Sequence, residues 1–184
     1  PPFDWRRVSA FLAARAIAGV ERATDTGYAR TVSIGGSPGW LEVTPVADAA
    51  SLLLRVSAPR GADLLGVIER VRRIFDLDAD PLAISGALSQ SDELRPHLDA
   101  LRGLRVPGAW VGFELGVRAI LGQQVSVRGA STLAARLVRN FGKPIEGAPD
   151  GLSHLFPAPV ELANADLAAL GLPRARATAI RGFA

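Results

Sequence analysis

The chain has 184 residues, 48% of them hydrophobic, and a formal net charge of +3. It contains no cysteine and only two histidines, His97 and His154, which excludes disulfides and thiolate chemistry and makes a zinc site unexpected. There is no run of about 18 apolar residues and no basic leader followed by an apolar stretch, so we expect a cytoplasmic protein without a membrane span.

The basic residues are almost all arginine, because Lys143 is the only lysine. Arginine forks match the geometry of phosphate groups, so nucleic acid is a partner to consider. A GC-rich coding sequence would produce the same bias, and the 18 acidic residues nearly balance the 21 basic ones. Both explanations stay open at this point.

The chain contains no methionine, so it does not start at a natural initiator. At the other end, an amphipathic pattern runs from Pro173 through Phe183, and the chain ends at Ala184 without a closing C-cap glycine. We therefore expect this chain to be a fragment of a longer protein.

The first predicted helix follows Asp4, a suitable N-cap, and places Val8, Phe11, Leu12 and Arg15 on one face. Arg15 is the charged member of this apolar stripe. Its guanidinium either reaches water at the edge of the stripe or faces a pocket shared with the second half of the chain.

A two-residue period then predicts strands. Tyr28, Arg30, Val32 and Ile34 alternate with smaller residues, the glycine-rich segment 35–39 reads as a hairpin turn, and the return strand carries Leu41 and Val43. Leu52, Leu54 and Val56 mark another strand after a turn at residues 47–50.

An amphipathic helix from Gly61 to Phe75 completes this region, and its predicted buried stripe consists of Leu64, Ile68, Val71 and Phe75. The first 80 residues therefore predict a small α+β domain with an antiparallel sheet.

The segment 76–80, Asp-Leu-Asp-Ala-Asp, has the spacing of a calcium-loop opening. Pro81 stands where that loop needs glycine and Ala87 where it needs glutamate, so calcium is rejected. Asp80 is better explained as an N-cap before a first-turn proline. We place a domain boundary at residue 80, with domains 1–80 and 81–184.

The second domain is predicted to be all-helical, with almost no strand beyond Pro81. Helical spacing occurs at residues 82–88, 93–101, 113–122, 126–141, 160–163, 167–170 and from 173 onward.

The centre of this domain runs from Phe113 to Gly142, where two apolar helices meet at a short polar turn. The turn presents Gln123 and Gln124, and Ser126 is a credible N-cap for the second helix. It is either a solvated corner or a surface that touches a substrate.

Several segments, in order along almost the whole chain, resemble AlkA-type 3-methyladenine DNA glycosylase II. They are Pro1-Pro2-Phe3-Asp4-Trp5, Phe11-Leu12-Ala13-Ala14-Arg15-Ala16, Tyr28-Ala29-Arg30, Phe75-Asp76-Leu77-Asp78, Gly86-Ala87-Leu88, the stretch from Val117 to Ser126, and Leu170-Gly171-Leu172-Pro173.

The resemblance implies an N-terminal domain like half of the TATA-binding protein, followed by a truncated all-α helix-hairpin-helix glycosylase domain. It also implies excision of alkylated bases, of the 3-methyladenine and 7-methylguanine type, from double-stranded DNA by base flipping and hydrolysis of the N-glycosidic bond. A cytoplasmic monomer that acts on bacterial nucleoid DNA, without metal or other cofactor, is expected.

The family's catalytic aspartate follows a hairpin of the type LPGIGxxTA, and neither occurs in this sequence. We expect that aspartate to lie beyond Ala184. No catalytic residue is therefore assigned within the chain, and the chain alone is predicted to be inactive.

Four positions match functional residues of that family. Phe11 and Arg15 resemble residues of the base pocket, where a phenyl ring offers a cationic base a contact worth about 0.5–2 kcal/mol. Gln123 and Gln124 match the minor-groove wedge that fills the gap left by a flipped nucleotide. Some AlkA-type members carry leucine at the second position, whereas related endonuclease III-type enzymes resemble this chain in carrying two glutamines.

Alternative functions are a non-enzymatic DNA-binding module and the C-terminal part of a fused alkylation-response methyltransferase or regulator. A structural scaffold without a nucleic-acid role is a further alternative. Glu114 is the nearest rival for a catalytic carboxylate, and we expect it instead to pair with Arg118 at i,i+4.

Overall fold

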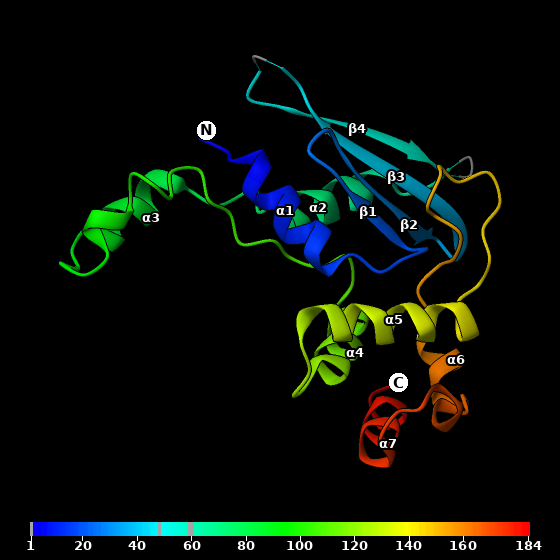
Figure 1. The fold of residues 1–184 in the computed structure, drawn as a ribbon. Coiled ribbons are helices and arrows are strands. Elements are labelled where there is room, and N and C mark those ends of the chain that lie inside the picture. Colours follow the sequence, from blue (N-terminus) through cyan, green and yellow to red (C-terminus); the bar gives the residue numbers. More distant parts are fainter. Residues whose placement is uncertain (1, 48, 59–60) are drawn as a thin grey trace.

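The computed structural model of the protein describes residues 2–47, 49–58 and 61–184. Pro1 of the first quoted motif and residue 48 of the predicted 47–50 turn lie outside the described residues. The four strands form one antiparallel sheet in the order β1-β2-β3-β4 (Figure 1). They are β1 (Glu21–Ala23), β2 (Tyr28–Ile34), β3 (Ser37–Pro45) and β4 (Leu52–Ser57).

The β2–β3 turn is shorter than the sequence suggested. Ile34 pairs directly with Ser37, so only Gly35 and Gly36 form the turn, with φ angles of 58° and 82°. Two successive positive φ angles match the right-handed twist of the flanking strands, and glycine adopts them without strain. The prediction that residues 37–39 belong to the turn was wrong, because Ser37 and Pro38 already lie in β3.

Two helices pack on the sheet. Asp4 caps α1 (Trp5–Arg15) by accepting from the Arg7 N–H at 3.0 Å, as predicted. Asp63 caps α2 (Leu64–Ile74), so this helix begins three residues later than the sequence suggested.

The predicted stripe of α2 is only partly correct. Its buried residues are Val67, Val71 and Ile74, whereas Leu64 and Ile68 are 53% and 43% exposed. A 4-3 spacing starting at Val67 faces the sheet, whereas Leu64 is the first residue of the helix and Ile68 lies about 100° round the helix from Val67.

The remaining elements are helical. They are α3 (Pro81–Leu88), the 3₁₀ turn η1 (Arg95–His97), α4 (Gly112–Gly122), α5 (Val127–Phe141), α6 (Pro159–Ala163), the 3₁₀ turn η2 (Leu167–Leu170) and α7 (Arg174–Phe183). The predicted Asp80 cap is confirmed by bonds from the N–H groups of Leu82 and Ala83 at 2.9 and 3.2 Å. An antiparallel sheet followed by helices confirms the predicted α+β class.

The helix predicted at residues 93–101 was wrong, because the structure has only the single turn η1 there. Pro96 lies within that turn, and proline in a helix interior removes a hydrogen bond and clashes with the preceding turn. Nearby, α3 has no buried residue and projects away from the other elements (Figure 1). Among the described residues, no helix is long and apolar enough to cross a membrane.

Buried apolar side chains form two cores. The sheet core lies between the sheet and helices α1 and α2, and it also receives Trp110. The helical core is formed by α4, α5, α6, η2 and α7, and it also receives Ile17 and Val20 from the segment after α1. Each core therefore borrows side chains from the other half of the chain. The division into domains 1–80 and 81–184 remains a prediction.

Candidate functional site

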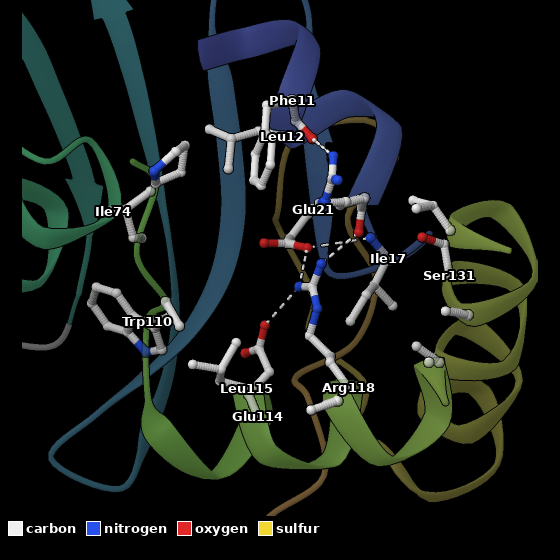
Figure 2. Close-up of a pocket in the computed structure, with 18 of the residues that line it drawn as sticks. Phe11, Leu12, Ile17, Glu21, Ile74, Trp110, Glu114, Leu115, Arg118 and Ser131 are labelled. Atoms are coloured by element: carbon white, nitrogen blue, oxygen red, sulfur yellow. Dashed lines mark hydrogen bonds and ion pairs between the residues drawn. The ribbon is translucent and has the colours of Figure 1, made fainter. Parts of the chain in front are cut away.

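A cavity of about 380 Å³ lies where the sheet layer meets the helices. Helix α1 lines one side with Phe11 and Arg15, while α4 and the start of α5 line the other. Gly122 and Val125, the first and last residues of the glutamine turn, also line it. The structure therefore brings the predicted base-pocket residues and the base of the predicted wedge to one cavity (Figure 2).

Phe11 and Arg15 lie against each other within this cavity. The Arg15 guanidinium carbon lies 3.7 Å from the centroid of the Phe11 ring, and Phe11 as a residue is 40% exposed. Nη1 of Arg15 also donates to the Phe11 carbonyl at 3.3 Å. Arg15 is half-buried and lines the cavity, and its role in a base pocket stays a prediction.

Three buried charges and one partly exposed charge line the cavity and form a closed ring of ion pairs, which we call the charge ring. Its members are Glu21 of β1, Arg30 of β2, and Glu114 and Arg118 of α4 (Figure 2). Arg30 lies 3.5 Å from Glu21 and 2.6 Å from Glu114. Arg118 lies 2.8 Å from Glu21 and 3.1 Å from Glu114, and the latter contact confirms the predicted i,i+4 pair.

The ring is stable because each charge contacts two opposite charges. Burial alone would raise the pKa of Glu21, but the guanidinium groups of Arg30 and Arg118 outweigh it and hold that pKa below its usual range. Burial would likewise lower the pKa of Arg30, and the carboxylates, Glu114 first, raise it above its usual value instead. Burial likewise opposes the charge of Arg118, and Glu21 and Glu114 raise its pKa above the usual value, so Glu21, Arg30 and Arg118 are charged at neutral pH.

The ring also fixes helix α1 relative to helix α4. Nη2 of Arg118 donates to the Arg15 carbonyl at 2.6 Å, which holds the end of α1. Glu21 accepts from the Ile17 N–H at 3.3 Å and so holds the segment that follows. The base-pocket side chains and the helix that leads into the glutamine turn are thus parts of one hydrogen-bonded unit.

Tyr28, the only tyrosine in the chain, donates its hydroxyl to Glu21 at 2.8 Å and is buried. Burial and the neighbouring Glu21 carboxylate raise its pKa well above the usual value. A raised folded-state pKa contributes stability below about pH 10 and loses it as pH rises toward the folded value. We expect ultraviolet absorbance to show no tyrosinate in the folded protein near pH 10.

Tyrosinate should then appear together with the loss of circular dichroism, because the phenol ionises when the protein unfolds. A titration near pH 10 with the dichroism unchanged would contradict the burial of Tyr28 beside Glu21.

Gln123 and Gln124 are both exposed at the turn between α4 and α5. Gln123 has φ −61° and ψ 125°, Gln124 has φ 55°, and the Val125 N–H donates to the Gly122 carbonyl at 3.5 Å. These are the dihedrals of a type II turn, which usually has glycine or asparagine where this chain has Gln124. A left-handed non-glycine residue costs about 1–2 kcal/mol.

The predicted Ser126 cap is confirmed, since its hydroxyl oxygen accepts from the Gly129 N–H at 3.1 Å. On the other side of the turn, Nη2 of Arg176 in α7 donates to the Gln123 carbonyl at 2.7 Å. The glutamine turn is thus held by a helix end on each side and by one side chain from a third helix.

Ala184 is the residue beyond which the catalytic aspartate is expected. In the structure it follows α7, where its N–H donates to the Ile180 carbonyl at 3.0 Å, and it packs half-buried against the helical core. It does not line the cavity, and an alanine side chain offers no acid, base or charge. Ala184 is thus a structural residue, and the position of the aspartate beyond it stays a prediction.

Four residues that take part in the site were not predicted from sequence, and they are Glu21, Arg30, Trp110 and Arg176. Glu21 and Trp110 gave no periodic signal, since one is in a three-residue strand and the other follows a loop. Arg30 did give a signal that was not used, because it occupies an inward position in an otherwise apolar strand alternation. The described residues contain no cluster of three or more His, Cys, Asp or Glu side chains that could hold a metal ion.

Comparison with known proteins gives consistent matches. A family model described as the AlkA N-terminal domain matches residues 1–111. DNA-3-methyladenine glycosylase 2 of Escherichia coli is 40% identical over 185 residues, covering 98% of this chain and 62% of that protein. The probable bifunctional transcriptional activator/DNA repair enzyme AlkA of Mycobacterium tuberculosis is 39% identical over 182 residues, covering 99% of this chain and 36% of that protein.

The fold also matches a solved structure. The 3-methyladenine DNA-glycosylase from Archaeoglobus fulgidus superposes with a TM-score of 0.83 at 20% identity, over 98% of this chain and 63% of that one. At that identity the likeness shows the fold alone. The chain spans less than two thirds of the E. coli relative and about a third of the mycobacterial one.

Proposed function

We propose, from the premise that the chain belongs to the family of the AlkA N-terminal domain, that it forms part of a base-excision repair DNA glycosylase. The substrate class is double-stranded DNA with alkylated bases of the 3-methyladenine and 7-methylguanine type. The reaction is base flipping followed by hydrolysis of the N-glycosidic bond. The similarity to the E. coli glycosylase over 98% of this chain supports this proposal.

One observation carries the proposal: the glutamine turn opens onto the cavity that holds Phe11 and Arg15. A wedge at Gln124 would occupy the space of a nucleotide leaving the helix, and the flipped base needs a pocket next to that wedge. A volume of about 380 Å³ falls within the usual range for small-molecule pockets.

Phe11 supports selection of cationic bases. Its ring face already carries a cation, because the Arg15 guanidinium lies 3.7 Å from the ring centroid. An alkylated purine is flat and positively charged like a guanidinium, so it can replace Arg15 on the ring. We therefore assign Phe11 as the stacking surface and Arg15 as the group that a flipped base displaces from it.

We propose that this part of the protein binds and positions the base while a carboxylate elsewhere in the enzyme stabilises the oxocarbenium-like transition state. The carboxylates that line the cavity are Glu21 and Glu114, and both are paired with arginine in the charge ring. A carboxylate between two guanidinium groups has little net negative field to offer. A base made cationic by alkylation is a good leaving group, so a cofactor is not required.

The wedge is tested by Gln124→Ala. We expect this variant to bind a duplex with an abasic site several-fold more weakly, while its affinity for an undamaged duplex stays within about twofold. A plug matters only when a nucleotide has left the stack, and unstacking costs a few kcal/mol. Fluorescence anisotropy at one fixed salt concentration measures both affinities.

Gln90→Ala is the matched control, because Gln90 is also exposed but lies at the end of α3, far along the chain from the turn. It should change neither affinity. Equal losses on both duplexes for Gln124→Ala would identify Gln124 as an ordinary backbone contact and would remove the wedge from the proposal.

A second candidate is that the chain comes from a fused regulator. The mycobacterial relative carries the words transcriptional activator and DNA repair enzyme in its name, and the matched part is 36% of its length. Sequencing the gene upstream of residue 1 decides this, because a fused regulator would show a further domain in the same reading frame.

A further inference from the structure

The central peptide of the glutamine turn joins Gln123 to Gln124, and its orientation decides which turn type forms. Type I and type II turns differ mainly in ψ of the first central residue, by about 150°, and in φ of the second, by about 170°. That difference is a rotation of the one peptide between them. The observed ψ of 125° at Gln123 and φ of 55° at Gln124 are those of type II.

The sequence by itself favours the other turn. Glutamine is not a residue that prefers positive φ, and type I accommodates it without strain. The ends of the turn do not dictate the choice either. Gly122 ends α4, and Ser126 caps α5 through its own bond to Gly129, so the central peptide can rotate without moving either helix.

Arg176 is the side chain that contacts this peptide. Its Nη2 donates to the Gln123 carbonyl oxygen at 2.7 Å across 53 residues of sequence. In a type I turn that carbonyl would point away and the Gln124 N–H would turn toward the guanidinium. A guanidinium cannot accept a hydrogen bond from an N–H. Arg176 therefore stabilises the type II turn by binding the Gln123 carbonyl, and it destabilises a type I turn by repelling the Gln124 N–H.

Helix α7 is placed firmly enough to hold Arg176 there. The rings of Phe113 in α4 and Phe183 in α7 stack at 5.6 Å and 5° between their planes. Gly116 lets Phe183 approach closely, because a Cβ there would collide with the ring. Ala177, next to Arg176, is buried in the helical core.

We propose that Arg176 is a positioning residue that locks the glutamine turn in its type II form and thereby aims Gln124 at the DNA. The direction of the Cα–Cβ bond at Gln124 depends on its φ, so rotating the peptide would swing the side chain away from its present direction. This inference rests on the proposed wedge function for its consequence in DNA binding, but the turn conformation can be measured in the free protein.

The first measurement is therefore made without DNA. In the whole 184-residue chain, the three-bond HN–Hα coupling and carbon shifts of Gln124 report its φ by nuclear magnetic resonance. We expect Arg176→Met to shift these values from positive toward negative φ, while Arg174→Met, a neighbouring exposed arginine in the same helix, leaves them unchanged. Retention of positive φ in Arg176→Met would overturn the inference.

The second measurement compares abasic and undamaged duplexes. Arg176→Met should bind the abasic duplex roughly tenfold more weakly, as expected for a lost charge-assisted hydrogen bond, with a much smaller change on undamaged DNA. Adding Gln124→Asn should restore part of the preference, because asparagine keeps an amide and tolerates positive φ. If Arg176→Met instead weakens binding to both duplexes equally, and the slope of log affinity against log salt concentration falls by about one, Arg176 is a phosphate contact.

The two failures are distinguishable. A wild-type chain without preference for the abasic duplex contradicts the proposed wedge, while the resonance measurement still decides the role of Arg176. If Arg176→Met does not fold, Arg176→Lys keeps the charge but loses the planar fork, and it should show the same shift at Gln124 to a smaller extent.

Discussion

The 184-residue chain by itself is expected to release no 3-methyladenine or 7-methylguanine from alkylated DNA above background. In the same assay, E. coli DNA-3-methyladenine glycosylase 2, its 40% identical relative, serves as the positive reference. The expected deficit is at least about 10² to 10⁴ in rate, which corresponds to a few kcal/mol of lost transition-state stabilisation.

The reason lies in the electrostatics of the cavity. An oxocarbenium-like transition state needs a nearby negative charge that is not already neutralised. Glu21 and Glu114 are the carboxylates that line the cavity, and the charge ring engages both. The other predicted functional residues of this chain include Phe11 and the two glutamines, which carry no charge, and Arg15, whose charge has the wrong sign.

A version extended beyond Ala184, through the expected hairpin and aspartate, should recover activity, and substituting that aspartate by asparagine should remove it again. If the 184-residue chain matched the extended protein and Glu114→Gln abolished its activity, the charge ring would be the catalytic centre. The present assignment of the carboxylate would then be wrong.

Breaking the charge ring should cause the largest loss of stability among single substitutions of similar size. Glu114→Gln removes one of two buried negative charges and leaves Arg30, which is 2% exposed, with only Glu21 as a partner. Leaving a buried charge unpaired costs about 3–5 kcal/mol. For Glu114→Gln we expect the free energy of unfolding to fall by about 3 kcal/mol, at the lower end of that range, because Arg118 is 25% exposed and water can solvate its charge.

Denaturant unfolding measures this loss, and thermal unfolding should show a Tm lower by roughly 6–12 °C for a chain of this size. Glu42→Gln is the matched control: Glu42 pairs with Arg22 and Arg55, whose side chains are 44% and 72% exposed. Surface ion pairs of this kind contribute about 0–1 kcal/mol to the free energy of unfolding, so Glu42→Gln should lower that free energy only slightly. Similar losses in both variants would mean that the ring does not hold the two layers together.

The fold was largely predictable from sequence because its signals are local. The two-residue alternation from Tyr28, the Asp80-Pro81 cap and the apolar helices around the glutamine turn all depend on neighbours along the chain. The errors have local causes as well as distant ones. Pro96 was overlooked as a helix breaker, and the buried face of α2 depended on the sheet it packs against.

The site was less predictable because its contacts cross the chain. Arg30 meets Glu114 over 84 residues, and Arg176 meets Gln123 over 53. No spacing rule relates such positions. The resemblance to a family supplied Phe11, Arg15, Gln123 and Gln124 as candidates, and the assignment of functional roles to them remains a prediction.

The exchange of side chains between the two cores constrains the order in which the protein can fold as it is synthesised. The sheet core is incomplete until Trp110 has left the ribosome, well after the last strand ends at Ser57. Ile17 and Val20 acquire their packing partners later still, because those partners lie in α4, α5 and α7 and extend to Ile180. The segment that joins α1 to β1 therefore lacks its full set of packing partners until Ile180 has been synthesised, and the N-terminal layer reaches its final packing only when the helical half closes over it.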